Sequence, residues 1–302
     1  MAGIYSVHDA IIGVQSALGG RGGGASFIGA YDEIPSIVAA YGMRRLLASY
    51  TGALVRLRRA SDNAESDFGY DANGDLDVAA IATWLTATTG YAVTWYDQSG
   101  NSKNVTQSTA ANQPLYVASG QNSRSVSRFD GVDDSLQAGA SLLATNAIFS
   151  LVIGTKITNE PLAGALLSQY AAATAGRLAW MANQNDSGAN QAGRFNPFFQ
   201  SATSGAGLAG VPDDFAYAAP SLISFVNTGA AEGAKIYLNG TVQESFTVTS
   251  VYAGNTGIGR DHASILDPFD GDIYEIVIAS AAWSDANRQA AEAALNTYWS
   301  IY

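Results

Sequence analysis

Trp95-Tyr96-Asp97-Gln98-Ser99-Gly100 joins an aromatic strand pattern to a polar turn, and the fold can be worked out from this stretch in both directions. Residues 91–96 are expected to form a strand. Neighbouring side chains of a strand point to opposite faces, so one of Trp95 and Tyr96 must enter the core. The next four residues form a turn whose side chains can hydrogen-bond their own backbone. Upstream, residues 53–59 alternate as a second strand, and a helix is expected over residues 36–50, directly after Pro35.

Downstream, short strand patterns alternate with turn residues. Further strands are expected at 148–153, 221–226 and 272–278, together with a hairpin at 235–242 that turns at Asn239-Gly240. Ser284 is expected to cap a C-terminal helix that runs to about Tyr298. Many short strands without alternating helices predict a mainly β protein, built as a two-sheet antiparallel sandwich of the jelly-roll type.

The chain is expected to divide into an N-terminal attachment segment, residues 1–34, and a sandwich domain, residues 35–302. The segment carries an apolar stripe with helical spacing (Val7, Ile11, Val14 and Leu18), which predicts a helical arm. The glycine-rich run at residues 19–24 would then act as a flexible joint. The alternative is a helix that packs on its own domain.

Composition excludes several classes of function. The net charge of -11 opposes binding to nucleic acid or to anionic lipid. No apolar run approaches the roughly 20 residues of a membrane span. The chain has no cysteine and only two histidines, so no metal cluster and no cofactor is expected. Residues 1–5 show no basic region followed by an apolar core, which indicates a protein made in a cytoplasm without a signal peptide.

Three blocks carry a family resemblance: Arg44-Arg45-Leu46-Leu47, Arg58-Arg59-Ala60-Ser61-Asp62 and Trp95–Gly100. Their order and spelling resemble the N-terminal part of the catalytic domain of α-L-arabinofuranosidase B. The blocks Phe129-Asp130-Gly131, Tyr237-Leu238-Asn239-Gly240 and Phe269-Asp270-Gly271 resemble the laminin-G and concanavalin A-like lectin group. Both resemblances imply a concanavalin A-like sandwich.

The arabinofuranosidase resemblance implies a catalytic Glu and a catalytic Asp, which in a retaining glycosidase lie about 5–5.5 Å apart. Asp261 follows Thr256-Gly257-Ile258-Gly259-Arg260 and matches the acid/base position; the alternative is that it only shapes a turn. At the nucleophile position, within residues 180–185, Gln184 replaces the Glu. A neutral amide cannot form the glycosyl-enzyme intermediate. The family's pair of adjacent cysteines is also missing.

With the nucleophile replaced, the leading hypothesis is a non-enzymatic surface protein of a phage or prophage virion, in the tail, a fibre or the head. The three blocks also resemble modules of such proteins. A lectin-like site for host glycans would combine an aromatic platform with amide and carboxylate groups, and the expected set is Trp180, Gln184, Asn185 and Asp261. The alternatives are an active arabinofuranosidase-like hydrolase that uses Asp261 as acid/base, and a structural capsid decoration subunit without a ligand.

The expected partners follow from this hypothesis. Residues 1–34 would bind other virion proteins, the chain would form a homo-oligomer located in the virion, and no nucleic acid or membrane would be bound. Asp71, Asn73, Asp75 and Asp77 place oxygen atoms at alternate positions, as at the start of a calcium loop. The alternative is a polar hairpin turn that faces Arg56, Arg58 and Arg59. Because the acidic run 62–77 follows these arginines, internal ion pairs are expected there.

Overall fold

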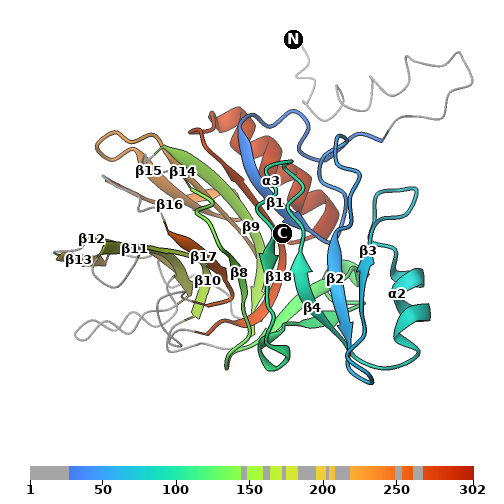
Figure 1. Ribbon diagram of the computed structural model, residues 1–302. Coiled ribbons are helices and arrows are strands. Elements are labelled where there is room, and N and C mark those ends of the chain that lie inside the picture. The colour runs from blue at the N-terminus through green and yellow to red at the C-terminus, as the bar shows by residue number, and fades with distance from the viewer. Residues whose placement is uncertain are drawn as a thin grey trace, which may run out of the picture.

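The computed structural model of the protein describes residues 27–143, 148–158, 164–171, 175–182, 195–201, 204–207, 218–248, 254–260 and 268–302. This part of the chain is mainly β, as predicted, with two α-helices, α2 (Val78–Leu85) and α3 (Asp285–Trp299) (Figure 1). Two short 3-10 helices, η1 (Ala110–Asn112) and η2 (Gln121–Ser123), lie in connections. Among the described residues, neither α-helix has the length and hydropathy that a membrane crossing requires.

A first run of antiparallel strands is paired in the order β16–β15–β14–β9–β18–β1. In chain order its members are β1 (Ile37–Gly42), β9 (Phe149–Ile157), β14 (Pro220–Asn227), β15 (Ala234–Leu238), β16 (Thr241–Phe246) and β18 (Asp270–Ala279). The helix α3 packs on β9 and β14 of this run.

A second run is paired in the order β3–β2–β4–β5–β8–β17–β10–β11–β12–β13, again antiparallel throughout. Its members are β2 (Val55–Arg59), β3 (Glu65–Phe68), β4 (Gly90–Trp95), β5 (Val105–Thr106), β8 (Leu136–Ala138), β10 (Gly164–Ala171), β11 (Ala175–Ala182), β12 (Phe195–Ser201), β13 (Ser204–Gly207) and β17 (Asn255–Ile258). The strands β6 (Leu115–Val117) and β7 (Val126–Asp130) connect the two runs, because β6 pairs with β4 and β7 pairs with β18.

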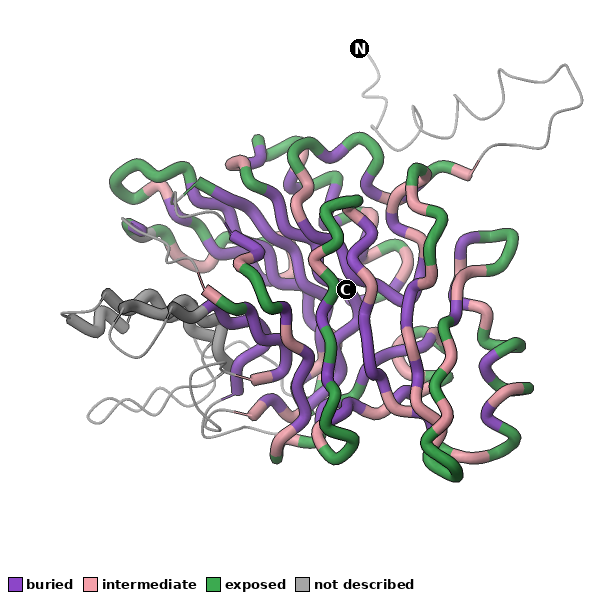
Figure 2. The backbone as a smooth tube through the Cα atoms, in the orientation of Figure 1, coloured by how far each residue is buried: buried purple, intermediate pink, exposed green. Residues whose placement is uncertain are grey.

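Two hydrophobic cores hold these strands. The first takes side chains from both runs, among them Trp95, Leu136, Ile153 and Phe225. The second lies between the first run and α3 and contains Tyr274 and Trp299, which stack on each other. Successive residues of β9 enter different cores, so its strand is apolar on both faces, and Figure 2 shows the central strands buried along most of their length.

The predicted helix over residues 36–50 is wrong, because residues 37–42 form strand β1. This strand pairs with β18, and Ala39 and Ala40 enter the first and second core respectively. An apolar run that is buried on both faces shows no alternation, so periodicity alone does not separate it from a buried helix.

The predicted strands, the hairpin and the C-terminal helix are confirmed. Strands occupy the expected positions at 53–59, 91–96, 148–153, 221–226 and 272–278. The hairpin turns at Asn239 and Gly240, both with positive φ, and the Ser284 hydroxyl accepts a hydrogen bond from the Asn287 amide at the start of α3.

Most of the predicted attachment segment and its helical arm, residues 1–26, lies outside the described residues. The described remainder packs onto the domain. Tyr31 and Ile34 are buried in the second core, and the Tyr31 amide donates to the Leu46 carbonyl over 3.1 Å.

Candidate functional site

The turn after β4 joins β1 to the second strand run through hydrogen bonds. As predicted, one of its aromatic residues enters the core: Trp95 is fully buried, while the Tyr96 hydroxyl donates to Asp67. The carboxylate of Asp97 accepts hydrogen bonds from the amides of Ala40 (3.0 Å) and Ser99 (2.9 Å). The turn therefore bonds its own backbone, as expected, and also the backbone of β1.

Gln98 extends this connection to the loop after β1. Its side-chain oxygen accepts from the Leu46 amide (2.8 Å), and its Nε2 donates to the carbonyls of Gly42 (3.1 Å) and Arg44 (2.9 Å). With an exposed fraction of 1%, Gln98 has no access to a substrate. The residues that carry the family resemblance most clearly are thus ones that hold the fold together.

Glu275 is a fully buried carboxylate with a complete set of donors. Arg44 binds it through two parallel hydrogen bonds of 2.8 and 2.9 Å, and Trp299 Nε1 donates over 3.1 Å. The Tyr31 hydroxyl is a further donor. Burial, together with the negative charge of Glu275, holds the pKa of Tyr31 well above its usual value, so the hydroxyl keeps its proton. With these partners Glu275 is a structural group and not a catalytic one.

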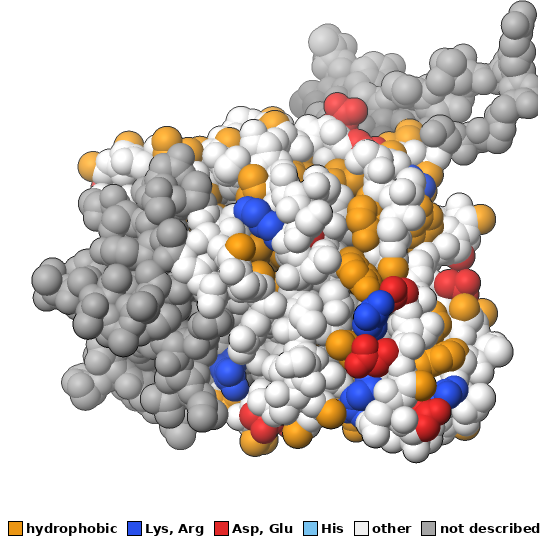
Figure 3. All heavy atoms as spheres, in the orientation of Figure 1, with side chains coloured by type: hydrophobic (Ala, Val, Ile, Leu, Met, Phe, Trp, Pro, Cys, Tyr) orange, Lys and Arg blue, Asp and Glu red, His pale blue; other side chains and the backbone are white. Residues whose placement is uncertain are grey.

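Two of the three arginines of β2 pair with the acidic run that follows them, as predicted, whereas the described partners of Arg58 are the neutral oxygens of Gln113, Asn63 and Ala110. Arg56 binds Asp67 (2.7 Å) and lies 3.9 Å from Glu65, and Arg59 binds Asp62 (2.7 Å). Figure 3 shows basic and acidic side chains intermixed over this part of the surface. These pairs neutralise Arg56 and Arg59.

The residues of the predicted calcium loop make separate contacts. Asp77 caps α2 by accepting from the Ala80 amide (2.9 Å), and Asp75 binds Arg124 (3.1 Å). Asp71 accepts from the amides of Asn73 (2.8 Å) and Asp75 (3.0 Å). Within the described residues these side chains do not converge on one point. The ion pair that Asp75 makes is with Arg124, and not with one of the three predicted arginines.

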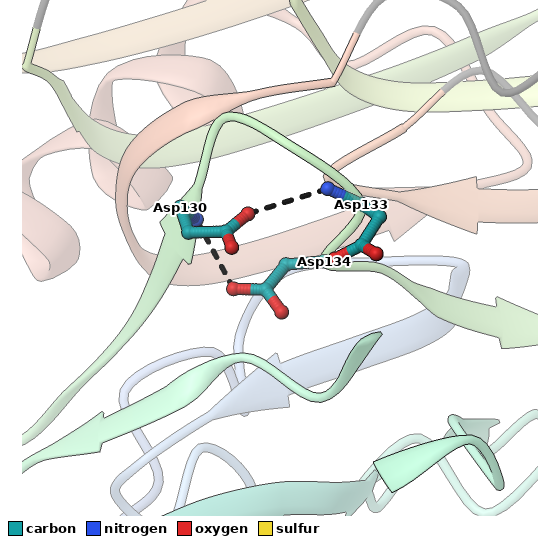
Figure 4. Close-up of side chains that lie close together, drawn as sticks. All are labelled: Asp130, Asp133 and Asp134. Atoms are coloured by element: carbon teal, nitrogen blue, oxygen red, sulfur yellow. Dashed lines mark hydrogen bonds between the residues drawn. The ribbon is translucent and has the colours of Figure 1, made fainter. Parts of the chain in front are cut away.

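Three other carboxylates do lie together, in the turn between β7 and β8. One oxygen from each of Asp130, Asp133 and Asp134 falls within 4.8 Å of the others, close enough to share a cation (Figure 4). The Asp130 amide donates to Asp134 Oδ2 over 3.1 Å. Burial, and then the charge of Asp130, raises the pKa of Asp134 to about 7. The Phe129-Asp130-Gly131 block pointed to this turn, but only as a fold marker.

Of the predicted glycan and catalytic residues, Gln184, Asn185 and Asp261 lie outside the described residues, and Trp180 lies in β11. The strands that lead to them are arranged around β10. Leu167 of β10 is paired with Trp180 on one side and with Ile258 of β17 on the other. Because β11 and β17 are both antiparallel to β10, they run in the same direction, and their C-terminal ends lie at the same edge of the sheet.

The end of β17 is fixed to β10. The Gly259 amide donates to the Leu166 carbonyl (3.1 Å), and the Ser168 hydroxyl donates to the Arg260 carbonyl (2.9 Å). Strands two places apart in a sheet are separated by about 10 Å. From these two neighbouring ends the sequence continues into Gln184–Asn185 and into Asp261.

Comparisons with known proteins agree with this architecture. The family model for the catalytic domain of α-L-arabinofuranosidase B matches residues 28–139. A crystal structure of an arabinofuranosidase complexed with arabinofuranosyl-α-1,2-xylobiose is similar to 89% of this chain, with a TM-score of 0.68 and 18% sequence identity. A GH54 α-L-arabinofuranosidase soaked with a cyclic sulfate inhibitor covers the same share, with a TM-score of 0.64 and 17% identity. The chain spans 64% of the length of each of these two structures. No curated protein sequence matches it.

These matches contradict the hypothesis of a non-enzymatic virion protein. The family model and both structures belong to arabinofuranosidases, so the hydrolase alternative fits better. The hypothesis depended on Gln184 standing at the nucleophile position. The virion location and the contacts of residues 1–34 with other virion proteins remain predictions.

Proposed function

We propose that this chain is a glycoside hydrolase that removes α-L-arabinofuranosyl groups from a larger glycan. One observation carries the proposal: the chain has the fold of arabinofuranosidases over most of its length, and residues 28–139 also match their catalytic-domain model in sequence. In this proposal the two strand runs form the two sheets of a concanavalin A-like sandwich. The first hydrophobic core, which takes side chains from both runs, supports that arrangement.

The catalytic groups of the proposal follow the two strand ends that meet at one edge. Asp261, after β17, is the general acid/base, which protonates the leaving glycosidic oxygen and later deprotonates water. The nucleophile must be a carboxylate. The first carboxylate after β11 is Asp186, two residues beyond Gln184, and we assign it this role. Trp180, Gln184 and Asn185 keep the proposed role of sugar contacts.

The test is hydrolysis of 4-nitrophenyl α-L-arabinofuranoside by the full chain. Asp186→Asn should lower kcat/KM by at least about a thousandfold, because the covalent intermediate is lost. Asp261→Asn should instead lower kcat by about a hundredfold or more, because hydrolysis of the intermediate loses the general base that activates water. Sodium azide should restore turnover in Asp261→Asn, because azide attacks the intermediate without a general base.

Asp62→Asn is the matched control, since it removes an exposed carboxylate that pairs only with Arg59 among the described arginines. Its kcat/KM should equal that of the wild type. Absence of turnover in the wild type, or turnover that survives in both Asp186→Asn and Asp261→Asn, would overturn the proposal.

A further inference from the structure

A pocket whose lining residues are not on the strands of the proposed catalytic edge suggests a second site. The pocket has a volume of about 620 Å³, which lies within the range of about 300–1,000 Å³ that is typical of small-molecule sites. Its lining residues come from β4, β6, β7, β9 and β18 and the connections next to them. None of them belongs to β10, β11 or β17, the strands that lead to Asp186 and Asp261.

A row of side chains across five strands forms one wall of this pocket. The register pairs Tyr91 of β4 with Leu115 of β6, and Leu115 with Arg128 of β7. Arg128 is then paired with Asp272 of β18, and Asp272 with Lys156 of β9. Residues directly opposite each other on neighbouring strands point to the same face, so these five line up. The row therefore runs from an aromatic ring through an ion pair to a lysine.

The ion pair in the middle of the row is already neutralised. Arg128 binds Asp272 through two hydrogen bonds of 2.6 and 2.9 Å. Lys156 is different: within the part of the chain that the structure describes, its ammonium group has neither an ion pair nor a hydrogen bond. At the other end, the Arg58 guanidinium covers one face of the Tyr91 ring at 4.9 Å. The row thus offers a charged donor at one end and an aromatic ring at the other.

Positions next to this row, at the end of β7 and in the turn after it, supply acceptors. Asp134, with an exposed fraction of 5%, and the exposed Asp130 both line the pocket. Figure 4 shows their side chains at the turn after β7. After the Arg128–Asp272 pair, the pocket holds the carboxyl groups of Asp130 and Asp134 against the one ammonium group of Lys156. This balance of charge disfavours an anionic ligand.

We propose that this pocket is a second carbohydrate site, which binds a neutral oligosaccharide. A sugar has an apolar face, which suits Tyr91 and Leu115, and hydroxyl groups that both donate and accept. Asp134 and Lys156 would form charge-assisted hydrogen bonds with those hydroxyls. Only the choice of a pentose as probe rests on the proposed function, because an arabinofuranosidase acts on pentose-containing glycans; the site itself rests on the pocket.

The experiment is a titration of the full chain with arabinotriose and with xylobiose, followed by calorimetry and by the amide NMR shifts of residues 128–134. We expect binding with a Kd of about 1 mM and shifts at these amides. Lys156→Met keeps the aliphatic stem and removes the charged donor, and it should weaken binding about tenfold. Lys235→Met, on the exposed face of β15, is the matched control and should bind as the wild type does. Trigalacturonic acid should not bind.

Two outcomes would overturn the proposal. One is the absence of shifts at residues 128–134 with both neutral sugars. The other is binding that is unchanged in Lys156→Met and in Tyr91→Ala. Hydrolysis of 4-nitrophenyl α-L-arabinofuranoside separates the two proposals, because Lys156→Met should leave it unchanged. A chain without hydrolysis whose sugar binding depends on Lys156 would refute the proposed function and retain the pocket.

Discussion

Arg44 and Glu275 show how much one buried ion pair can determine. The pair joins the loop after β1 to β18, and the donors Tyr31 and Trp299 connect it to the N-terminal part of the described chain and to α3. A buried pair of this kind adds little net stability against an apolar replacement of both partners. Loss of one partner is costly, because the other charge is left buried and unpaired.

Arg44→Met should therefore lower the free energy of unfolding by about 3–5 kcal/mol. Arg56→Met is the control, because Arg56 pairs with Asp67 on the surface and its side chain is 40% exposed. Arg56→Met should lower the free energy of unfolding by about 0–1 kcal/mol. Urea unfolding followed by tryptophan fluorescence measures both. Equal losses in the two variants would contradict this account of the buried pair.

Asp134 should make stability depend on pH. Its pKa in the folded protein is about 7, above the value of about 3.9 that an unfolded chain has. A raised carboxyl pKa contributes stability below the unfolded pKa, and this contribution is lost as the pH rises through about 7. Asp134→Asn does not ionise and can still accept from the Asp130 amide. The free energy of unfolding of Asp134→Asn, taken relative to that of the wild type, should rise by about 1–2 kcal/mol between pH 4 and pH 8. Solvent in the pocket screens part of the effect.

Urea unfolding at pH 4, 6 and 8 measures this change. Asp130→Asn is the second variant: it removes the neighbouring charge and leaves burial in place. In this variant the free energy of unfolding should depend less on pH than in the wild type, but the dependence should still be present. A difference between Asp134→Asn and wild type that stays constant with pH would contradict the assignment.

At the scale of elements, the sequence predicts strands well where one face is polar. Residues 53–59 alternate, and they form β2 with Arg56 half-exposed and Val55 buried. Residues 37–42 do not alternate, because β1 is buried on both faces, and a helix was predicted there. What decides between the two is the pairing of β1 with β18, which lies more than 200 residues later in the chain. No local pattern carries that information.

Gly259, at the end of β17, combines two constraints. Its φ is +81°, and a Cβ atom there would lie 2.2 Å from the ring of the fully buried Phe129. Gly100 shares only the first constraint, with a φ of +87° and no atom within 4 Å of such a Cβ. Gly100→Ala should lower the free energy of unfolding by about 1 kcal/mol, because alanine disfavours this backbone conformation. Gly259→Ala should lower it by about 1–3 kcal/mol more, because its methyl group also overpacks the core.

Thermal and urea unfolding of both alanine variants measure this difference. Because Gly259 precedes Asp261 by two residues, Gly259→Ala should also lower the proposed arabinofuranosidase activity, whereas Gly100→Ala should not. Equal stability of the two variants would mean that Phe129 moves away at little cost.

At the scale of the whole molecule, the sequence predicted the residues that hold the strands together better than it predicted the residues of the pocket and the proposed catalytic site. Asp97 and Gln98 were recognisable because a turn makes local demands on residue type. The pocket was not, because Tyr91, Arg128, Lys156 and Asp272 meet only through strand pairing. The proposed catalytic carboxylates follow strand ends, where sequence spacing does not fix which side chains converge.

The boundary of the domain is the last feature that can be tested on the whole molecule. The sequence placed it after residue 34, but Tyr31 is fully buried and donates to Glu275, and Ile34 is 7% exposed. Removal of residues 1–34 should therefore destabilise the domain by at least about 4 kcal/mol more than removal of residues 1–26, since two buried side chains are lost. Tyr31→Phe, which removes only the hydroxyl, should account for about 1–3 kcal/mol. If both truncated chains unfold at the same urea concentration, residues 27–34 belong to the attachment segment, as the sequence suggested.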